Sequence, residues 1–216
     1  MKRILFLLIL LSAQAGLLKA QNSSGYILFS MQYSESGLSK EEMAMLPEQS
    51  EWWFKGGKMK MRMPMGMGMQ SDVLVMEDKV FLLMDLMGNK MAMKTDREEM
   101  EKQVGKNKKY KLKSKSAETK TIAGYECRKA IMGAEGEKDM MVWYTDKIKG
   151  AGSWYYQMDE LDGFPLEFSM KTNEIDIRMV AKEVKLETVS DDVFSVPEGY
   201  KVMSQAEMMQ MMGGSR

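Results

Sequence analysis

The chain has 216 residues, with 31 basic residues balanced by 31 acidic ones and a formal net charge of zero at neutral pH. It contains no histidine and one cysteine, Cys127, which excludes an intramolecular disulfide, zinc sites of the Cys/His type and histidine-based catalysis. Methionine, in contrast, occupies 27 of the 216 positions.

The first 20 residues have the features of a secretory signal peptide. Lys2 and Arg3 precede an apolar stretch over 4–11, and small residues at Ala15 and Ala20 offer cleavage sites. This stretch is far shorter than the roughly 20 apolar residues of a membrane span. We expect cleavage near Ala20, and hence a periplasmic or secreted protein that is not an integral membrane protein.

Removal of this leader takes away three basic residues, which leaves 28 basic and 31 acidic residues and a net charge of −3. An acidic surplus argues against nucleic acid as a partner, because phosphate binding needs excess positive charge. The lysine-rich stretch 106–120 is interpreted as a solvated strand face, with contact to an anionic surface as the alternative. We predict a single domain over 21–204 and a Met-rich tail or short helix over 205–216.

In the first half of the chain, apolar and polar residues alternate with a period of two, which is typical of strands with one buried face. The expected strands and hairpins cover 26–33, 51–55 with 58–63, 72–76 with 79–86, and 90–94. Two short helices are expected. Ser39 and Glu42 have the spacing of a capping box for the first, and the second covers 96–104.

The second half continues with a charged strand or linker over 109–116 and apolar strands over 121–132, 139–144, 164–170 and 174–189. In the last of these, the apolar phase shifts between Ala181 and Val184, which predicts a β-bulge that bends the strand. The fold class is therefore mainly β: a curved antiparallel sheet with one or two short helices.

Six methionines alternate with other residues from Met59 to Met69. In an extended strand their thioethers would all lie on one face. Pro64, Gly66 and Gly68 are poor strand residues, so the second half of this run is predicted to be a loop. A row of thioethers is either a pliable apolar surface or a set of ligands for a soft metal such as Cu(I).

Four segments together resemble a secreted Gram-negative family known as domain of unknown function 4412: Thr121–Lys129, Val142–Asp146, Gly163–Leu166 and Asp191–Tyr200. This family is similar in layout to periplasmic lipoprotein-carrier (LolA-like) proteins. The resemblance implies an antiparallel half-barrel wrapped around helices, and it implies no established activity. In lipoprotein carriers the concave face holds acyl chains, but no motif of single residues carries that role to this chain.

We favour a non-enzymatic carrier with a Met-rich apolar groove for a lipid or another hydrophobic molecule. The expected groove residues are Met59, Met61, Met63, Trp143 and Phe164. The first alternative is a Cu(I)-binding protein that uses the loop methionines Met65, Met67 and Met69. The second is a structural or stress-related exported protein whose methionines form the core or scavenge oxidants.

The sequence shows no nucleophile elbow, phosphate-binding loop or dinucleotide fingerprint. We therefore predict no enzymatic activity and no cofactor, apart from Cu(I) in the first alternative. The sequence makes no prediction of the oligomeric state.

Overall fold

The computed structural model describes residues 24–34, 38–96, 98–100, 110–134, 138–149, 158, 160–172, 175–207 and 210. The expected leader lies outside these residues, as do most of the helix expected over 96–104 and most of the tail from 205. Residues 98–100 and 205–207 are helical. Within the described part, no helix has the length and apolar character that crossing a membrane requires.

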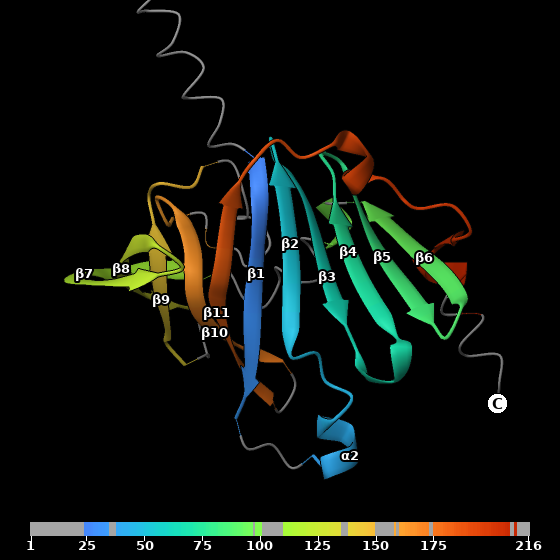
Figure 1. Ribbon diagram of the computed structural model, residues 1–216, viewed down its shortest axis with the longest axis horizontal. Coiled ribbons are helices and arrows are strands. Elements are labelled where there is room, and N and C mark those ends of the chain that lie inside the picture. Colours follow the sequence, from blue (N-terminus) through green and yellow to red (C-terminus); the bar gives the residue numbers. More distant parts are fainter. Residues whose placement is uncertain are drawn as a thin grey trace, which may run out of the picture.

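The described residues form one sheet of twelve strands (Figure 1), in the order β12-β6-β5-β4-β3-β2-β1-β11-β10-β9-β8-β7. The strands are β1 (Ser24–Tyr33), β2 (Gln49–Lys55), β3 (Lys58–Pro64), β4 (Gln70–Val75), β5 (Lys79–Leu86), β6 (Asn89–Asp96), β7 (Lys111–Ile122), β8 (Tyr125–Gly133), β9 (Met140–Thr145), β10 (Phe164–Thr172), β11 (Ile175–Leu186) and β12 (Lys201–Ser204). The predicted fold class, mainly β with a curved sheet, is confirmed.

Two details of the prediction are wrong. The strand expected over 121–132 is two strands, because Ala123 and Gly124 form a turn with positive φ angles between β7 and β8. The sheet is also not wholly antiparallel, since β12 pairs with β6 in parallel. A parallel pair needs a long crossover. The chain provides one when it leaves β11 and crosses the sheet to reach β6.

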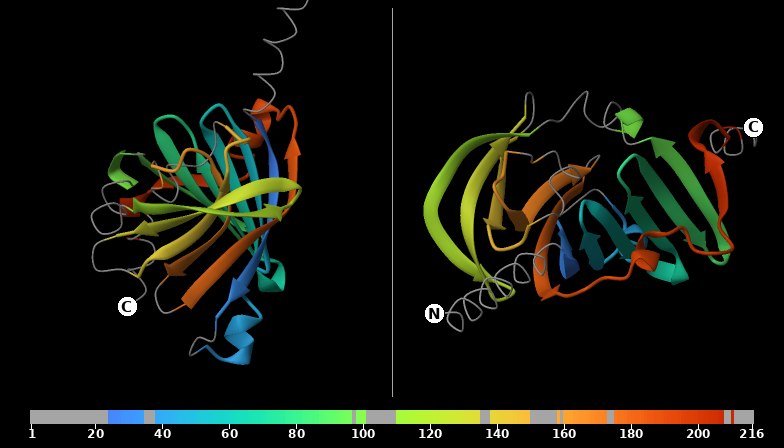
Figure 2. Two further views of the ribbon diagram at one scale, coloured as in Figure 1. Left: turned by 90° about the vertical axis from the view of Figure 1, so that its left-hand side faces the viewer. Right: turned by 90° about the horizontal axis from the view of Figure 1, so that it is seen from above.

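The sheet curves into an open half-barrel, which is seen most clearly from above (Figure 2). Part of the curvature has a local cause in β11. Leu28 of β1 pairs with Glu183, and the next residue, Phe29, pairs with Ala181. Lys182 therefore has no partner in the ladder, which makes it a bulge and bends the strand. This bulge confirms the one predicted from the phase shift between Ala181 and Val184.

β1 joins two meanders, β2 to β6 on one side and β7 to β11 on the other. It pairs with β2 along Ser24–Ser30 and with β11 along Gly25–Tyr33. Gly25 is required at this junction, because a Cβ there would collide with the carbonyl oxygen of Lys185 and press against the ring of Phe54.

The concave face of the sheet carries the main hydrophobic cluster. Aromatic rings form its centre: the Phe29 and Trp52 centroids lie 4.6 Å apart, and the Phe54 and Phe164 centroids lie 5.9 Å apart. Three buried residues of the connection between β9 and β10 belong to the same cluster and help to cover the face: Ile148, Met158 and Leu161. All of these side chains are nearly inaccessible to solvent.

The convex face has its own cover, the segment 187–200 that follows β11 (Figures 1 and 2). Val196 and Tyr200 of this segment pack on a second hydrophobic cluster, Leu74, Leu83 and Ala92. The short 3-10 helix η3 (Asp191–Phe194) begins the crossing. Its Asp191 carboxylate lies 3.1 Å from the ammonium of Lys55 and 3.0 Å from that of Lys58.

Two buried charge clusters complete the convex face. In the first, Asp72, only 2% exposed, pairs with Lys60 and Arg62 at 3.4 Å each. In the second, Glu167 accepts hydrogen bonds from the ammonium of Lys120 (2.6 Å) and the guanidinium of Arg178 (2.7 Å). Buried carboxylates need such partners, because an unpaired buried charge is strongly destabilising.

Short helices lie at the ends of strands. α2 (Lys40–Met43) begins with the predicted capping box: the Ser39 hydroxyl accepts from the Glu42 amide, and the Glu42 carboxylate accepts from the Ser39 amide. The 3-10 turn η2 (Gly66–Gly68) connects β3 to β4, as the predicted loop requires.

The Glu167 cluster gives the protein a defined acid sensitivity. Burial raises the pKa of Glu167, but the hydrogen bonds and charges of Lys120 and Arg178 outweigh burial and hold it below its ordinary value. A carboxylate with a lowered folded-state pKa stabilises the protein above its unfolded-state pKa, near 4.3, and this stabilisation is lost as the pH falls through the folded-state pKa.

We therefore expect Glu167→Gln to lower the free energy of unfolding at pH 7 by about 1–3 kcal/mol, and by less at pH 3, which lies below the unfolded-state pKa. Urea unfolding at both pH values measures this difference. Glu118→Gln is the matched control, because Glu118 pairs with Lys129 on the exposed surface and should contribute little. An equal loss for Glu167→Gln at both pH values would contradict the assignment.

Candidate functional site

The structure places the five predicted groove residues in one hydrophobic cluster, with Met63 packing on it from a half-buried position. The other four belong to its buried part. Met59, Met61 and Phe164 are each 1% exposed, and Trp143 is 7% exposed. In the described structure, therefore, these four side chains are packed core, and only Met63 presents an accessible surface.

Trp143 has surroundings unlike those of the other four. It pairs in register with Glu167 on β10 and with Lys129 on β8. The ammonium of Lys120 lies 4.2 Å from the centroid of its ring, and its indole N–H has no hydrogen-bond partner among the described residues. Trp143 therefore lies on the convex face with Glu167, on the opposite side of the sheet from Met59, Met61 and Met63. There its ring is a platform for the Lys120–Glu167 ion pair.

The strand register extends the row of β3 methionines across the concave face. Met61 pairs with Val73, Val73 with Leu82, and Leu82 with Met93. Two residues further along β3, Met63 pairs with Ser71, Ser71 with Met84, and Met84 with Met91, which forms a second row. Paired residues of an antiparallel sheet lie on the same face, so the two rows form one surface.

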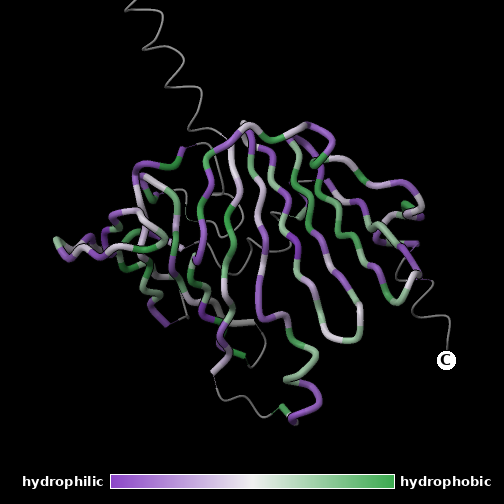
Figure 3. The backbone as a smooth tube through the Cα atoms, in the orientation of Figure 1, coloured by the Kyte–Doolittle hydropathy of each residue, from purple (hydrophilic) through white to green (hydrophobic). Residues whose placement is uncertain are grey.

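We call five residues of these rows the concave methionine face: Met63, Leu82, Met84, Met91 and Met93. All five are half-buried, whereas Met59 and Met61 next to them are fully covered. Figure 3 shows hydrophobic and hydrophilic residues mixed along the strands of this part of the sheet. The charged residues occupy the alternate positions of these strands, whose side chains lie on the convex side, as those of Arg62 and Asp72 do. The face is thus an apolar surface in the hollow of the half-barrel.

The groove residues predicted from the sequence did not include Leu82, Met84, Met91 and Met93. The alternation in 79–86 and 90–94 indicated strands, but it did not show which alternating set joins the β3 methionines. The hairpin turns decide which set it is, because the turn at Glu77 and Asp78 fixes the register of β4 with β5.

The loop methionines Met65, Met67 and Met69 lie in the turn between β3 and β4. The amide of Met65 donates to the carbonyl oxygen of Met69 at 2.9 Å, which closes the turn. Met67 at its tip is 67% exposed. The described residues contain no group of three or more histidine, cysteine or acidic residues suited to a metal ion.

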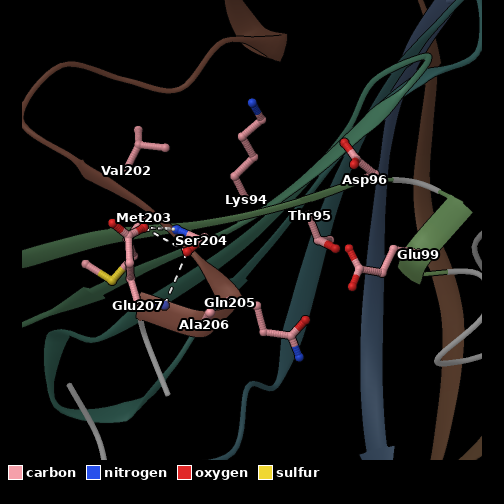
Figure 4. A pocket seen from close by; sticks show the side chains of 10 residues that line it. All are labelled: Lys94, Thr95, Asp96, Glu99, Val202, Met203, Ser204, Gln205, Ala206 and Glu207. Carbon is pink, nitrogen blue, oxygen red and sulfur yellow. Dashed lines mark hydrogen bonds between the residues drawn. The ribbon is translucent and has the colours of Figure 1, made fainter. Parts of the chain in front are cut away.

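A hollow of about 540 Å³ lies at the edge of the sheet, between β6, β12 and the helical residues 205–207. Figure 4 shows its lining, which mixes polar and apolar side chains and includes four charged ones, Lys94, Asp96, Glu99 and Glu207. The Glu207 carboxylate is already engaged, because it accepts from the amide (2.7 Å) and the hydroxyl (2.8 Å) of Ser204. This lining does not suit an apolar ligand.

The single cysteine is not a reactive group. Cys127 has no exposed surface, and burial is the main factor that raises its thiol pKa to about 11. The thiolate is the nucleophilic form, so a thiol with this pKa is inert at neutral pH.

We expect iodoacetamide at pH 8 to leave Cys127 unmodified in the folded protein and to alkylate it fully in 6 M guanidinium chloride. Mass spectrometry after a short exposure measures the two fractions. Rapid alkylation of the folded protein, under conditions in which its fluorescence spectrum stays native, would contradict the described burial.

Comparison with known proteins identifies the family. The sequence profile of the family described as "Domain of unknown function (DUF4412)" matches residues 38–200, which is most of the chain. The chain belongs to this family. The resemblance drawn from the four sequence segments is therefore confirmed. The search of curated proteins gave no match.

Several solved structures are similar to this member of the DUF4412 family. An uncharacterised conserved protein from Thermus thermophilus has 12% identity and a TM-score of 0.50, with 90% of this chain and 99% of that chain covered. The lipoprotein LppX of Mycobacterium tuberculosis has 10% identity and a TM-score of 0.40, with coverages of 80% and 92%. LprF from Mycobacterium bovis has 10% identity and a TM-score of 0.33, with coverages of 79% and 90%. At 12% identity, the likeness to the Thermus protein shows the fold alone.

Proposed function

We propose that this protein is an exported, non-enzymatic carrier, periplasmic or secreted, that holds a lipid or another hydrophobic molecule against the concave methionine face. The observation that carries the proposal is the half-buried state of Met63, Leu82, Met84, Met91 and Met93 on adjoining rows of a hollow surface. Contiguous apolar surface that stays open to water is costly and marks binding sites.

The chemistry of the face suits an apolar ligand of variable shape. Methionine is unbranched and polarizable, so its side chain adapts to different partners. The buried layer beside it, including Met61 and Val73, gives these side chains a fixed support. Four strands spaced about 4.8 Å apart make the face roughly 15 Å across, which is sufficient for part of an acyl chain.

The proposal predicts that polar substitutions on the face weaken ligand binding. We expect Met84→Gln with Met91→Gln to raise the Kd for a fluorescent fatty acid such as cis-parinaric acid by about tenfold or more, because each buried methionine contributes on the order of 1–2 kcal/mol. A fluorescence titration of purified protein measures this change.

Val202→Gln is the matched control for that titration. Val202 is 51% exposed on β12 and pairs with Ala92, so it lies in the row of the convex face. The same polar change there should leave the Kd unaltered. Equal affinities for the double variant and the wild type would refute the concave site. Native mass spectrometry of the protein isolated from its own compartment would then identify the natural ligand.

One observation supports the Cu(I) alternative. The hydrogen bond between Met65 and Met69 closes a turn that carries three methionines within five positions. A soft metal accepts two or more thioethers in this way. The groove and the turn use different residues, so separate variants test the two functions.

For the turn, we expect Met65→Leu, Met67→Leu and Met69→Leu combined to abolish Cu(I) binding in competition with a chelator, if the turn is the site. Leucine keeps the apolar volume and removes the sulfur. The matched control changes Met84, Met91 and Met93 to leucine, which removes three thioethers from the concave methionine face. Equal Cu(I) affinity in both triple variants and the wild type would exclude a site at the turn.

A further inference from the structure

Exposed apolar side chains gather at one end of the sheet. Among the described residues, six large hydrophobic side chains are exposed, and four of them lie at this end: Met45 (40%), Met67 (67%), Leu86 (40%) and Met87 (77%). We call these four residues the methionine rim. The remaining two, Met141 and Val202, belong to other strands of the sheet. The rim is therefore a local concentration, unlike the scattered apolar residues of ordinary surfaces.

The topology explains why the four residues share one end. β3–β4 and β5–β6 are consecutive antiparallel hairpins, and β4 pairs with β5, so their turns project from the same end of the sheet (Figure 1). The segment after α2 lies against the first turn, because the amide of Gly66 donates to the carbonyl oxygen of Met45 at 3.2 Å. Two turn tips and one adjacent segment thus present apolar side chains together.

The backbone at both tips makes the choice of methionine unusual. Met67 has φ 61° and Met87 has φ 56°, the left-handed region that glycine and asparagine adopt more readily. Folding alone would favour those residues at the tips of turns. Methionine at both positions instead places a long apolar side chain at the tip of each turn, where most of its surface is exposed to solvent.

The shape and charge of the methionine rim indicate which kind of partner it fits. Projecting tips suit a soft, deformable medium, whereas a rigid protein partner offers pockets of fixed shape. The charges near the second tip are mixed: the Asp85 carboxylate accepts from the amide of Gly88 at 2.7 Å and lies 4.0 Å from the ammonium of Lys90. Such a surface has no basic excess with which to bind an anionic membrane by electrostatics.

We propose that the methionine rim docks on a lipid bilayer by inserting its apolar side chains into the interface. The rim is continuous with the concave methionine face, because Met84 and Met91 occupy the strands that lead into the Leu86–Met87 turn. A hydrophobic ligand could then pass between the bilayer and the face with little exposure to water. This transfer rests on the proposed carrier function, whereas the docking itself does not.

Flotation of the purified protein with phosphatidylcholine vesicles, without added ligand, tests the docking. We expect the wild-type protein to float with the vesicles, and to do so equally well in 1 M salt, because apolar insertion is not screened. Met67→Asn with Met87→Asn should lower the partition coefficient by about tenfold or more, since two buried methionine side chains are lost. Asparagine tolerates positive φ, so the variant should fold, and thermal unfolding verifies this.

Met67→Leu with Met87→Leu is the matched control, which keeps the apolar side chains and removes the sulfur. Its flotation should equal that of the wild type. Loss of flotation in this variant would overturn the proposal, as would a wild-type protein that stays in solution, or an asparagine variant that floats unchanged. A dimer that dissociates in the asparagine variant, with no vesicle binding, would also overturn it and identify a second copy as the occupant.

The fatty-acid titration distinguishes the failure of docking from the failure of the carrier function. Flotation without binding of cis-parinaric acid would support docking and refute the carrier. Binding of the fatty acid without flotation would leave the carrier standing and refute docking.

Discussion

A single sheet without a second sheet packed on it must find separate cover for each of its two faces. In this protein the concave face is covered by residues of the β9–β10 connection, such as Ile148 and Leu161, and the convex face by the segment 187–200. Among the described residues, neither cover spans the whole sheet. The parts that are covered form the core, and the concave surface of β3 to β6 that stays half-open becomes the candidate site.

The distribution of cover explains how one residue type serves three purposes. Met59 and Met61 are core, Met84 and Met91 line the hollow, and Met67 projects into solvent. Their side chains are chemically identical, so the difference lies wholly in what the fold places over them. A compositional bias toward methionine is therefore not itself a motif, and the position of each residue relative to the two covers decides its role.

Alternation along the chain was sufficient to predict most strands, and the phase shift near Ala181 located the bulge at Lys182. The capping box of Ser39 and Glu42 could also be predicted from the sequence, because it depends on residues only three positions apart. The family followed from segments of sequence. What could not be predicted depends on contacts between distant segments. Examples are the parallel pairing of β12 with β6, and the position of Trp143 beside Lys120 and Glu167.

The central place of β1 in the sheet has a consequence for the timing of folding. Both meanders consist of strands that are neighbours in sequence, so each can form soon after it is synthesised. The ladder between β1 and β11 joins residues far apart in sequence, such as Gly25 and Leu186. Beside it, the Ser24 hydroxyl donates to the carbonyl oxygen of Glu187, 163 positions away. Until β11 is available, β1 is an uncovered edge strand that invites pairing with another chain. We therefore expect closure of this ladder to be the slow, non-local step that completes the half-barrel, and the chain to be most exposed to aggregation before it.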